Sequence, residues 1–468
     1  MDIILSQVLS VGFIIYDVLR IIIFEILCLR PLWLLNEKLN RLIYKIFGFE
    51  KLRARRPCET FYIIGRFKAG SADCSRQQDF FKIPRSFEPL SILRDNHWFV
   101  YSVERDYAYF IYHEKTLRDL QARSCCFLYL ESFREAKYLA RVRIDDFCRL
   151  HEAEFSTVSR TAVPQRNEHD KKRLRLVILN SVMRSGSTLL AQMLQIPDKL
   201  VVLSEPDCFT NLASMASESV LDQNVIDNAL RTIIAKFALE FSSPTGEILL
   251  IKPRQNMVYL TAAVQRLFPE TKIIFNFRSN VDKTLASLER AMITTTGPFK
   301  FVHYTGMRYC YYMNIIVSML MPNLVSPRVH PSFNHLTKPY CLSDFIAYYM
   351  IAPIYATSQD IIRHGMSIHT VNYEAFLNNP RQILSTILDY IGFCFDHTLT
   401  IDSYMEKSVV YLKKDSQSGT PMSSSVLAQQ HVQKFSMSKK MEYDTWCQRL
   451  NLKPMFVSGT MPENYYEN

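Results

Sequence analysis

A turn rich in glycine and hydroxyl groups has the clearest chemical pattern in the sequence. The apolar segment RLRLVILN, expected as a strand, is followed by SVMRSGST (Ser181–Thr188) and then by LLAQML, expected as a helix. Successive backbone N–H groups in such a turn, together with the N-terminus of the helix, can bind a phosphate. The sequence therefore predicts an anion-binding loop, with a plain strand-to-helix connection as the alternative.

The loop has the spacing of a Walker A loop but departs from it at two positions. Ser181 occupies the first glycine position, and Ser187 replaces the lysine. Without that lysine, a nucleotide triphosphatase lacks the cation that reaches the transferred γ-phosphate. Arg184 supplies a cation earlier in the loop, and the hydroxyl groups of Ser187 and Thr188 are available to phosphate oxygens. A nucleotide kinase or triphosphatase is therefore disfavoured and kept as an alternative.

The segment SVMRSGSTLL resembles the 5′-phosphosulfate-binding loop of the sulfotransferase superfamily, whose donor is 3′-phosphoadenosine 5′-phosphosulfate (PAPS). In the style of its motifs the chain is similar to carbohydrate and protein-tyrosine sulfotransferases. The resemblance implies that five loop residues bind the donor: Arg184, Ser185, Gly186, Ser187 and Thr188.

A later segment, IIFNFRSNVDKTLASL, looks like the second signature of this family, an arginine and a serine that bind the 3′-phosphate of the donor. Arg278 fits the arginine because a guanidinium can contact a phosphate through two N–H groups. The family usually places the serine eight residues later, where this chain has Ala286, and Ser287 follows one position further on. We expect Ser287 to take this role, although one position turns a helix by about 100°.

Two further segments extend the resemblance to residues 173–420. Ile251–Arg254 and the amphipathic helix after it are similar to the strand and helix that precede the second signature. HTVNYEAFLNNPRQILSTILDYIGF looks like the late strand, acidic turn and closing helix of the family. Residues 1–172 resemble no sulfotransferase element.

Sulfonyl transfer to a hydroxyl group needs a general base beside the donor sulfur. Glu205, in VVLSEPDCF, resembles the glutamate that follows the loop in carbohydrate and protein-tyrosine sulfotransferases. Its alternative role is that of a helix-terminal residue favoured by the helix dipole. Lys252 or Arg254 could stabilise charge on the bridging oxygen or the acceptor, or simply end a strand in solvent. We expect Glu205, Lys252 and Arg184 to be the catalytic residues.

Three features after the second signature each have a structural alternative. His303 is a reserve candidate for the base, or a solvated histidine. The aromatic segment 301–321 is core, or one wall of an acceptor pocket. The segment 413–420 resembles the flexible C-terminal loop of the family and could close over the nucleotide, or it is an exposed turn.

Apolar strands alternate with helices in the second half of the chain. Strands are expected at 174–179, 248–251, 273–277 and 367–371, and helices from Ser187 and at 258–268, 282–292 and 380–391. Alternation at this spacing is typical of an α/β fold, a P-loop parallel sheet flanked by helices.

The first half has a different pattern. Runs rich in β-branched and aromatic residues predict antiparallel strands at 61–67, 98–103, 107–113, 127–130 and 138–144, with a hairpin turn at 104–106. The polar segment 156–172 has the composition of a linker. We therefore divide the chain into an N-terminal segment (1–50), a small β-rich accessory domain (51–155), the linker (156–172) and a sulfotransferase-like domain (173–468).

Residues 1–34 are the most apolar segment, expected as a helix long enough to cross a bilayer. Asp17, Arg20 and Glu25 would be costly at the bilayer centre, so an interfacial or buried helix is the alternative. The basic residues that follow favour a cytoplasmic side, whereas the family resemblance favours the Golgi. We expect membrane association through residues 1–34, with a cytoplasmic protein as the alternative.

The composition is that of a globular, basic chain. Of 468 residues, 48% are apolar and 21% charged, which excludes a disordered or collagen-like polymer. The net charge of +10 favours anionic partners such as phosphates, acidic glycans or a membrane surface. The 11 cysteines include no Cys-x-x-Cys pair, so we expect free thiols and no metal site.

The sequence thus predicts in-line transfer of a sulfonyl group from PAPS to a hydroxyl group on a glycan, a tyrosyl residue or a small molecule. We expect positioning and electrostatic stabilisation to drive it, without a metal, a covalent enzyme intermediate or a nucleic-acid partner. A non-catalytic sulfotransferase-like binding protein is a further alternative, because the spacing of Ser287 is irregular and residues 1–172 lack a counterpart in the family.

Overall fold

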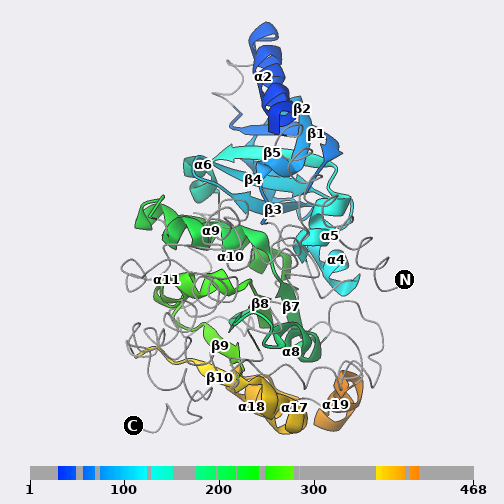
Figure 1. Ribbon diagram of the computed structural model, residues 1–468, viewed down its shortest axis with the longest axis vertical. Helices are drawn as coiled ribbons and strands as arrows, with labels where there is room; N and C mark the ends of the chain where they lie inside the picture. Colours follow the sequence, from blue (N-terminus) through cyan, green and yellow to red (C-terminus); the bar gives the residue numbers. More distant parts are fainter. Residues whose placement is uncertain are drawn as a thin grey trace, which may run out of the picture.

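The described elements form layers along the long axis of the molecule (Figure 1). The structure, a computed structural model, describes residues 30–48, 56–68, 74–123, 128–150, 174–196, 199–217, 219–241, 248–278, 284, 365–395 and 400–409. A β-rich sheet lies toward one end, helices α9 (Asp207–Ser217) and α10 (Gln223–Phe241) follow, and a second sheet with its outer helices lies toward the other end. The two halves of the chain are therefore stacked on each other.

Antiparallel pairing in the first sheet confirms the small β-rich domain, with the strand order β2-β1-β5-β4-β3. Its strands are β1 (Cys58–Arg66), β2 (Phe80–Glu88), β3 (Trp98–Val103), β4 (Tyr107–Tyr112) and β5 (Tyr138–Arg143). The short elements beside them are η2 (Gln77–Asp79), η3 (Leu90–Arg94), α4 (Leu117–Arg123), α5 (Leu128–Glu135) and α6 (Ile144–Arg149). The predicted hairpin is present, since the N–H of Glu104 donates to the carbonyl of Tyr107 at 2.8 Å.

The prediction of a strand at 127–130 is wrong, because helix α5 begins at Leu128. A short apolar run does not distinguish a strand from a helix, and LYLESFRE contains good helix formers. Strand β2 has no counterpart in the prediction because it contains Pro84 and charged residues. Proline is tolerated there since β2 lies at the edge of the sheet.

The second sheet confirms the α/β fold class, because all of its strand pairs are parallel. The strand order is β10-β9-β6-β8-β7. Its strands are β6 (Arg175–Ser181), β7 (Leu200–Ser204), β8 (Ile248–Lys252), β9 (Lys272–Phe277) and β10 (His369–Asn372). The loop at Ser181–Thr188 therefore follows the central strand, at the carboxyl edge where ligands bind in open α/β sheets.

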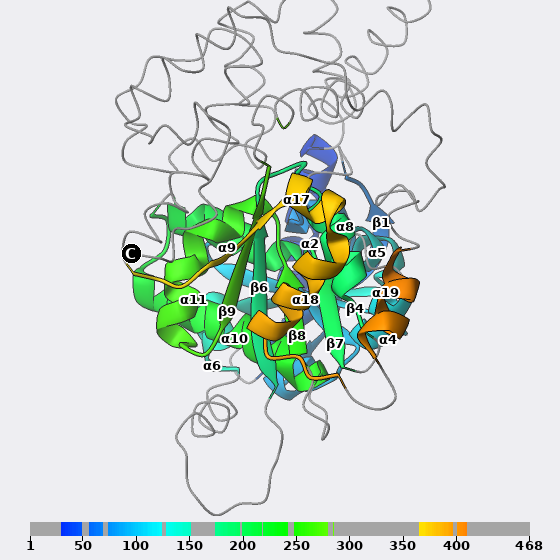
Figure 2. The same ribbon diagram turned by 90° about the horizontal axis from the view of Figure 1, so that it is seen from below.

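Helices cover both faces of the parallel sheet, as Figure 2 shows from below. Along β6, Val177 and Leu179 belong to the core on one face, whereas Ile178 belongs to the core on the other face. The first face carries α8 (Ser187–Leu194), α17 (Tyr373–Asn378), α18 (Pro380–Tyr390) and α19 (Ile401–Val409). The second face carries α9, α10, η4 (Gln255–Leu260) and α11 (Thr261–Leu267).

The helix predicted at 258–268 has a different beginning, since η4 is a 3₁₀ turn and the α-helix α11 starts at Thr261. The helix predicted at 282–292 lies outside the described residues except for Thr284. The predicted linker 156–172 also lies outside them.

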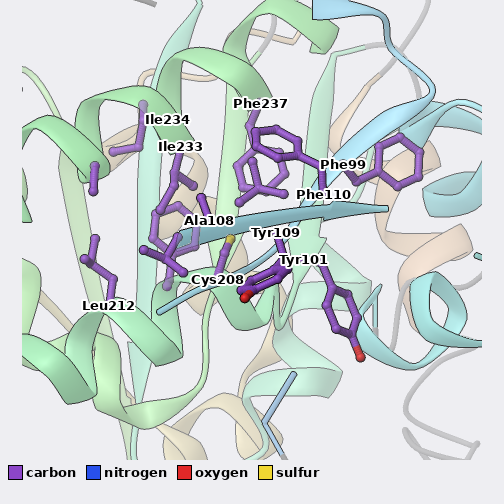
Figure 3. Packing of buried hydrophobic residues seen from close by; sticks show 14 of the residues in the cluster. Phe99, Tyr101, Ala108, Tyr109, Phe110, Cys208, Leu212, Ile233, Ile234 and Phe237 are labelled. Carbon is purple, nitrogen blue, oxygen red and sulfur yellow. The ribbon is translucent and has the colours of Figure 1, made fainter. Parts of the chain in front are cut away.

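The β-rich sheet and the α/β layers share one buried core (Figure 3). Phe110 of β4 and Phe99 of β3 belong to the same apolar cluster as Leu212 of α9 and Phe237 of α10. Side chains from the two halves pack closely against each other across this boundary, so they form a common interior. The β-rich domain is therefore built into the molecule as a layer over α9 and α10.

The N-terminal helix of the described chain is α2 (Arg30–Ile46), which packs against β2. Residues 1–29, most of the predicted membrane segment, lie outside the described residues. Among the described helices, none has both the length and the apolar character needed to cross a bilayer.

Candidate active site

The loop between β6 and α8 has an unusual backbone. Arg184 and Gly186 both adopt left-handed conformations, with φ of 61° and 79°. Between them, Ser185 donates from its N–H (3.3 Å) and its Oγ (2.6 Å) to the carbonyl of Val182. Left-handed residues in a short turn make concavities of N–H groups that bind anions, and a non-glycine residue with this φ stores strain. The backbone of the loop is therefore of the kind found in anion-binding turns, and Arg184 is exposed.

A buried asparagine on the neighbouring strand holds this loop. The carbonyl of Asn276 accepts from the N–H of Val182 at 3.1 Å, and its Nδ2 donates to the carbonyl of Ser185 at 3.0 Å. Sequence analysis did not select Asn276. The sequence feature that could have indicated it is the single amide side chain in the apolar strand IIFNF. A polar side chain buried in such a strand needs hydrogen-bond partners nearby.

Tyr373, the first residue of α17, connects the loop to Arg278. A Cβ added at Gly186 would lie 2.0 Å from Cε2 of Tyr373, so the ring lies directly on the glycine. On the same ring, the guanidinium carbon of Arg278 lies 4.6 Å from the centroid, within cation–π distance. Arg278 and the loop Ser181–Thr188 are thus brought together through Tyr373, a residue that sequence analysis missed.

Gly186→Ala is expected to abolish nucleotide binding and to destabilise the loop. A left-handed alanine costs about 1–2 kcal/mol, and the Tyr373 ring must move in addition. The matched control is Gly365→Ala, because Gly365 has the same φ of 79° with nothing within 4 Å of an added Cβ. Calorimetric titration with nucleotide checks this prediction, and equal losses of affinity in both variants would contradict it.

Glu205 lies beside the other end of the loop. It follows β7 with a left-handed backbone, φ 55°, and its N–H donates to the carbonyl of Lys252 at 2.6 Å. The ammonium of Lys252 ion-pairs with Oε1 of Glu205 and donates to Oγ1 of Thr188 at 3.3 Å. Two predicted catalytic residues and one predicted loop residue therefore meet at the N-terminus of α8.

Arg254 extends this pair toward a buried aspartate. Its Nε lies 3.8 Å from Oε2 of Glu205 and 2.9 Å from Oδ1 of Asp207. The Asp207 side chain is 1% exposed. Arg254 is thus a bridge between two carboxylates and does not end its strand in solvent. Asp207 was not among the predicted site residues, because an acidic residue directly after Pro206 is typical of the first turn of a helix.

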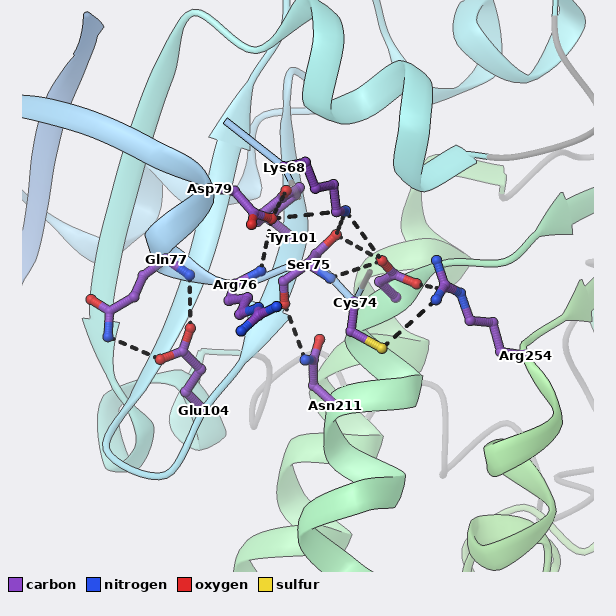
Figure 4. Close-up of polar contacts among 11 residues, drawn as sticks. Lys68, Cys74, Ser75, Arg76, Gln77, Asp79, Tyr101, Glu104, Asn211 and Arg254 are labelled. Atoms are coloured by element: carbon purple, nitrogen blue, oxygen red, sulfur yellow. Dashed lines mark hydrogen bonds and ion pairs between the residues drawn. The ribbon is translucent and has the colours of Figure 1, made fainter. Parts of the chain in front are cut away.

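Residues of the β-rich domain also contact Asp207. Figure 4 shows two of them, Lys68 and Ser75, on the side of the network opposite Arg254. Ser75 donates to Oδ2 of Asp207 from its N–H at 2.9 Å and from its Oγ at 2.8 Å. Lys68 lies 3.8 Å from both Asp207 and Asp79, and the Tyr101 hydroxyl donates to Asp79 at 2.5 Å. Burial raises the pKa of Asp79 to about 6, although Lys68 lowers it. A polar network therefore runs from Glu205 into the β-rich domain.

Several predicted features lie outside the described residues. They are Ser287, His303, the aromatic segment 301–321 and the segment 413–420. Within the described part of the chain, Cys58, Cys74, Cys148, Cys208 and Cys394 are free thiols. In that same part, no three His, Cys, Asp or Glu side chains gather as a metal site would require.

Comparison with known proteins adds structural neighbours. No family model and no curated protein matches the chain. Among solved structures, it is similar to mouse sulfotransferase SULT7A1 complexed with PAP, at 13% identity and a TM-score of 0.35, over 62% of this chain and 89% of that one. It is also similar to the sulfotransferase domain of the Synechococcus PCC 7002 olefin synthase, at 14% identity and a TM-score of 0.32, over 61% and 96%.

A third neighbour is a sulfotransferase from Alicyclobacillus acidocaldarius, at 10% identity and a TM-score of 0.31, over 62% of this chain and 97% of that one. These neighbours are sulfotransferases, the class that the loop and the second signature resemble.

Proposed function

We propose that this chain is a sulfotransferase that moves a sulfonyl group from PAPS to a hydroxyl acceptor. The observation that carries the proposal is the junction at Thr188, where the phosphate loop meets the Glu205–Lys252 pair. A loop that binds an anion explains donor binding, and an adjacent carboxylate explains proton removal. A triphosphatase would place its lysine within the loop, whereas this chain places Lys252 opposite it, on β8.

The donor would be held at two places. The N–H groups of residues 186–188, with the Ser187 and Thr188 hydroxyls, would bind the 5′-phosphosulfate, and Arg278 would bind the 3′-phosphate. The loop suits such a group because its left-handed residues Arg184 and Gly186 form a tight turn that leads into the N-terminus of α8. Ser287 stays a prediction for the 3′-phosphate.

The residues of the chain would act as follows. The donor supplies a sulfonyl group, whose bond to the bridging phosphate oxygen breaks as a bond to the acceptor oxygen forms. Glu205 would accept the proton of the acceptor hydroxyl. Lys252 would donate a hydrogen bond to the bridging oxygen and stabilise the charge left on it. In the present structure Lys252 pairs with Glu205, so donor binding is expected to draw its ammonium toward the loop.

The bisphosphate product, 3′,5′-adenosine bisphosphate, is expected to stabilise the protein more than ATP or AMP does. Both phosphate-binding places are used only by a nucleotide phosphorylated at both ends. At 100 times its dissociation constant, a ligand adds about 2.7 kcal/mol to the free energy of unfolding. Thermal unfolding with each nucleotide measures this difference, and an advantage for ATP with Mg²⁺ would support the kinase or triphosphatase alternative.

Arg278→Ala should remove the preference for the bisphosphate over AMP. The control is Arg266→Ala, since Arg266 is a surface arginine paired with Asp227 at 2.7 Å. If Arg278→Ala keeps the wild-type preference, the second signature is assigned wrongly.

The acceptor class is tested with labelled-sulfate transfer to glycans, tyrosyl peptides and small hydroxyl compounds. Golgi membrane association through residues 1–34 stays a prediction.

A further inference from the structure

Helix α2 packs on the β-rich sheet through polar residues. Nδ2 of Asn36 and Nδ2 of Asn40 donate to the carbonyl of Lys82, at 2.9 and 3.0 Å, and the N–H of Lys82 donates to Oδ1 of Asn36 at 3.2 Å. The ammonium of Lys82 lies 2.8 Å from Glu37. Asn36 and Asn40 are the buried residues of this helix. The usual arrangement of an amphipathic helix, with its apolar side against the protein, is therefore reversed.

The apolar side of α2 is exposed. Its residues recur at intervals of three and four positions and so lie in one stripe along the helix. Their exposed fractions range from 48% to 68%. They are Leu32, Leu35, Leu39, Leu42 and Ile46. In Figure 1, α2 extends beyond β1 and β2 at one end of the described part of the molecule.

Cationic residues lie next to this stripe. At about 100° per residue, they fall in the arc between the leucines and the face that carries Glu37. All of them are exposed: Arg30, Lys38, Arg41 and Lys45. Glu37 is the single acidic residue of α2, and it is ion-paired with the buried Lys82. The outer surface of α2 is therefore apolar and purely cationic.

This charge pattern favours a lipid surface over a second copy of the chain. The stripe has coiled-coil spacing, but Lys38 and Lys45 flank it without carboxylates at the positions that would face them. Within α2, a parallel pair would place Lys38 against Ile43, and an antiparallel pair would place lysine against lysine. Anionic headgroups pair with lysines beside an apolar face that enters the interface. We propose that α2 is a docking helix for anionic membranes, independent of sulfonyl transfer.

The test uses the full chain and vesicles of phosphatidylcholine with or without phosphatidylserine. Wild type should bind the anionic vesicles in flotation assays, more weakly as salt rises. Leu35→Ser with Leu39→Ser should lower the partition constant by on the order of a hundredfold, because both leucines would leave the interface. Lys38→Gln with Lys45→Gln should lower it by on the order of tenfold, on anionic vesicles alone.

The control is Ile64→Ser, because Ile64 on β1 is also 60% exposed but lies outside α2. Ile64→Ser should bind the anionic vesicles like wild type. In every variant, 3′,5′-adenosine bisphosphate should raise the unfolding temperature as it does in wild type, which shows that the variant is folded. Binding that survives the leucine substitutions would assign docking to another segment and overturn the proposal. A dimer by light scattering that the leucine substitutions dissociate, without vesicle binding, would also overturn it in favour of a second copy.

Discussion

Glu205→Gln is expected to reduce the rate of sulfonyl transfer by about 10²- to 10⁴-fold, the usual loss on removing a general base. Glutamine keeps the size and hydrogen bonding of the side chain but cannot take the acceptor proton. Nucleotide affinity should stay close to wild type, because among the described residues Lys252 links Glu205 to the loop. Labelled-sulfate transfer and bisphosphate binding, measured in parallel, separate the two effects.

The control for this prediction is Glu131→Gln, a surface carboxylate paired with Arg134 at 3.3 Å. It should change neither quantity. If Glu205 had a structural role alone, Glu205→Gln would lower the free energy of unfolding through the loss of its ion pair with Lys252 and would leave transfer intact. That outcome would remove the base role from Glu205 and make His303 the next residue to test. No transfer by wild type on any acceptor would favour the non-catalytic alternative.

The parts of the site that the sequence predicts are those specified by local pattern. Arg184–Thr188 follow an apolar strand and begin a helix, so their backbone is determined by neighbouring residues. Glu205 and Lys252 end parallel strands, and in such a sheet the ends of successive strands lie on one edge. The meeting of Lys252 with Thr188 therefore follows from the topology once the sheet is predicted.

The parts that the sequence does not predict depend on contacts between distant segments. Ser75 and Asp207 are 132 positions apart, and no periodic pattern links them. Tyr373 reaches Gly186 from a separate helix whose sequence resembles an ordinary helix start. Likewise, Phe110 and Phe237 lie in one apolar core, and their meeting depends on how the β-rich sheet stacks on α10. Tertiary packing decides such contacts.

The β-rich domain, to which sequence analysis assigns no chemical role, therefore contributes residues beside the candidate active site. Ser75 orients Asp207, Asp207 holds Arg254, and Arg254 lies beside Glu205. The side chains of all four residues are buried or mostly buried. In a low-dielectric interior, the loss of any of these contacts leaves a polar group unpaired and lowers the stability of the fold. The accessory domain is thus expected to influence both the stability of the molecule and the position of its candidate base.

Asp207→Asn is expected to lower the free energy of unfolding by about 3 kcal/mol, within the range for breaking a buried ion pair. The substitution leaves Arg254 and Lys68 charged without their shared carboxylate, at positions 11% and 4% exposed. The lower end of the range applies because Glu205 and Asp79 each remain 3.8 Å from one of these cations. Urea unfolding followed by circular dichroism measures the loss.

Two further variants test whether the loss of stability in Asp207→Asn comes from the buried polar network. Asp227→Asn removes a carboxylate paired with the exposed Arg266, so it should cost less than about 1 kcal/mol. Ser75→Ala removes one hydrogen bond to Asp207 from the β-rich side and should cost about 1–2 kcal/mol, with a lower transfer rate because Asp207 and Arg254 lose their orientation. If Asp207→Asn is as mild as Asp227→Asn, and Ser75→Ala transfers sulfate like wild type, then Asp207 merely begins α9 and the β-rich domain does not support the candidate active site.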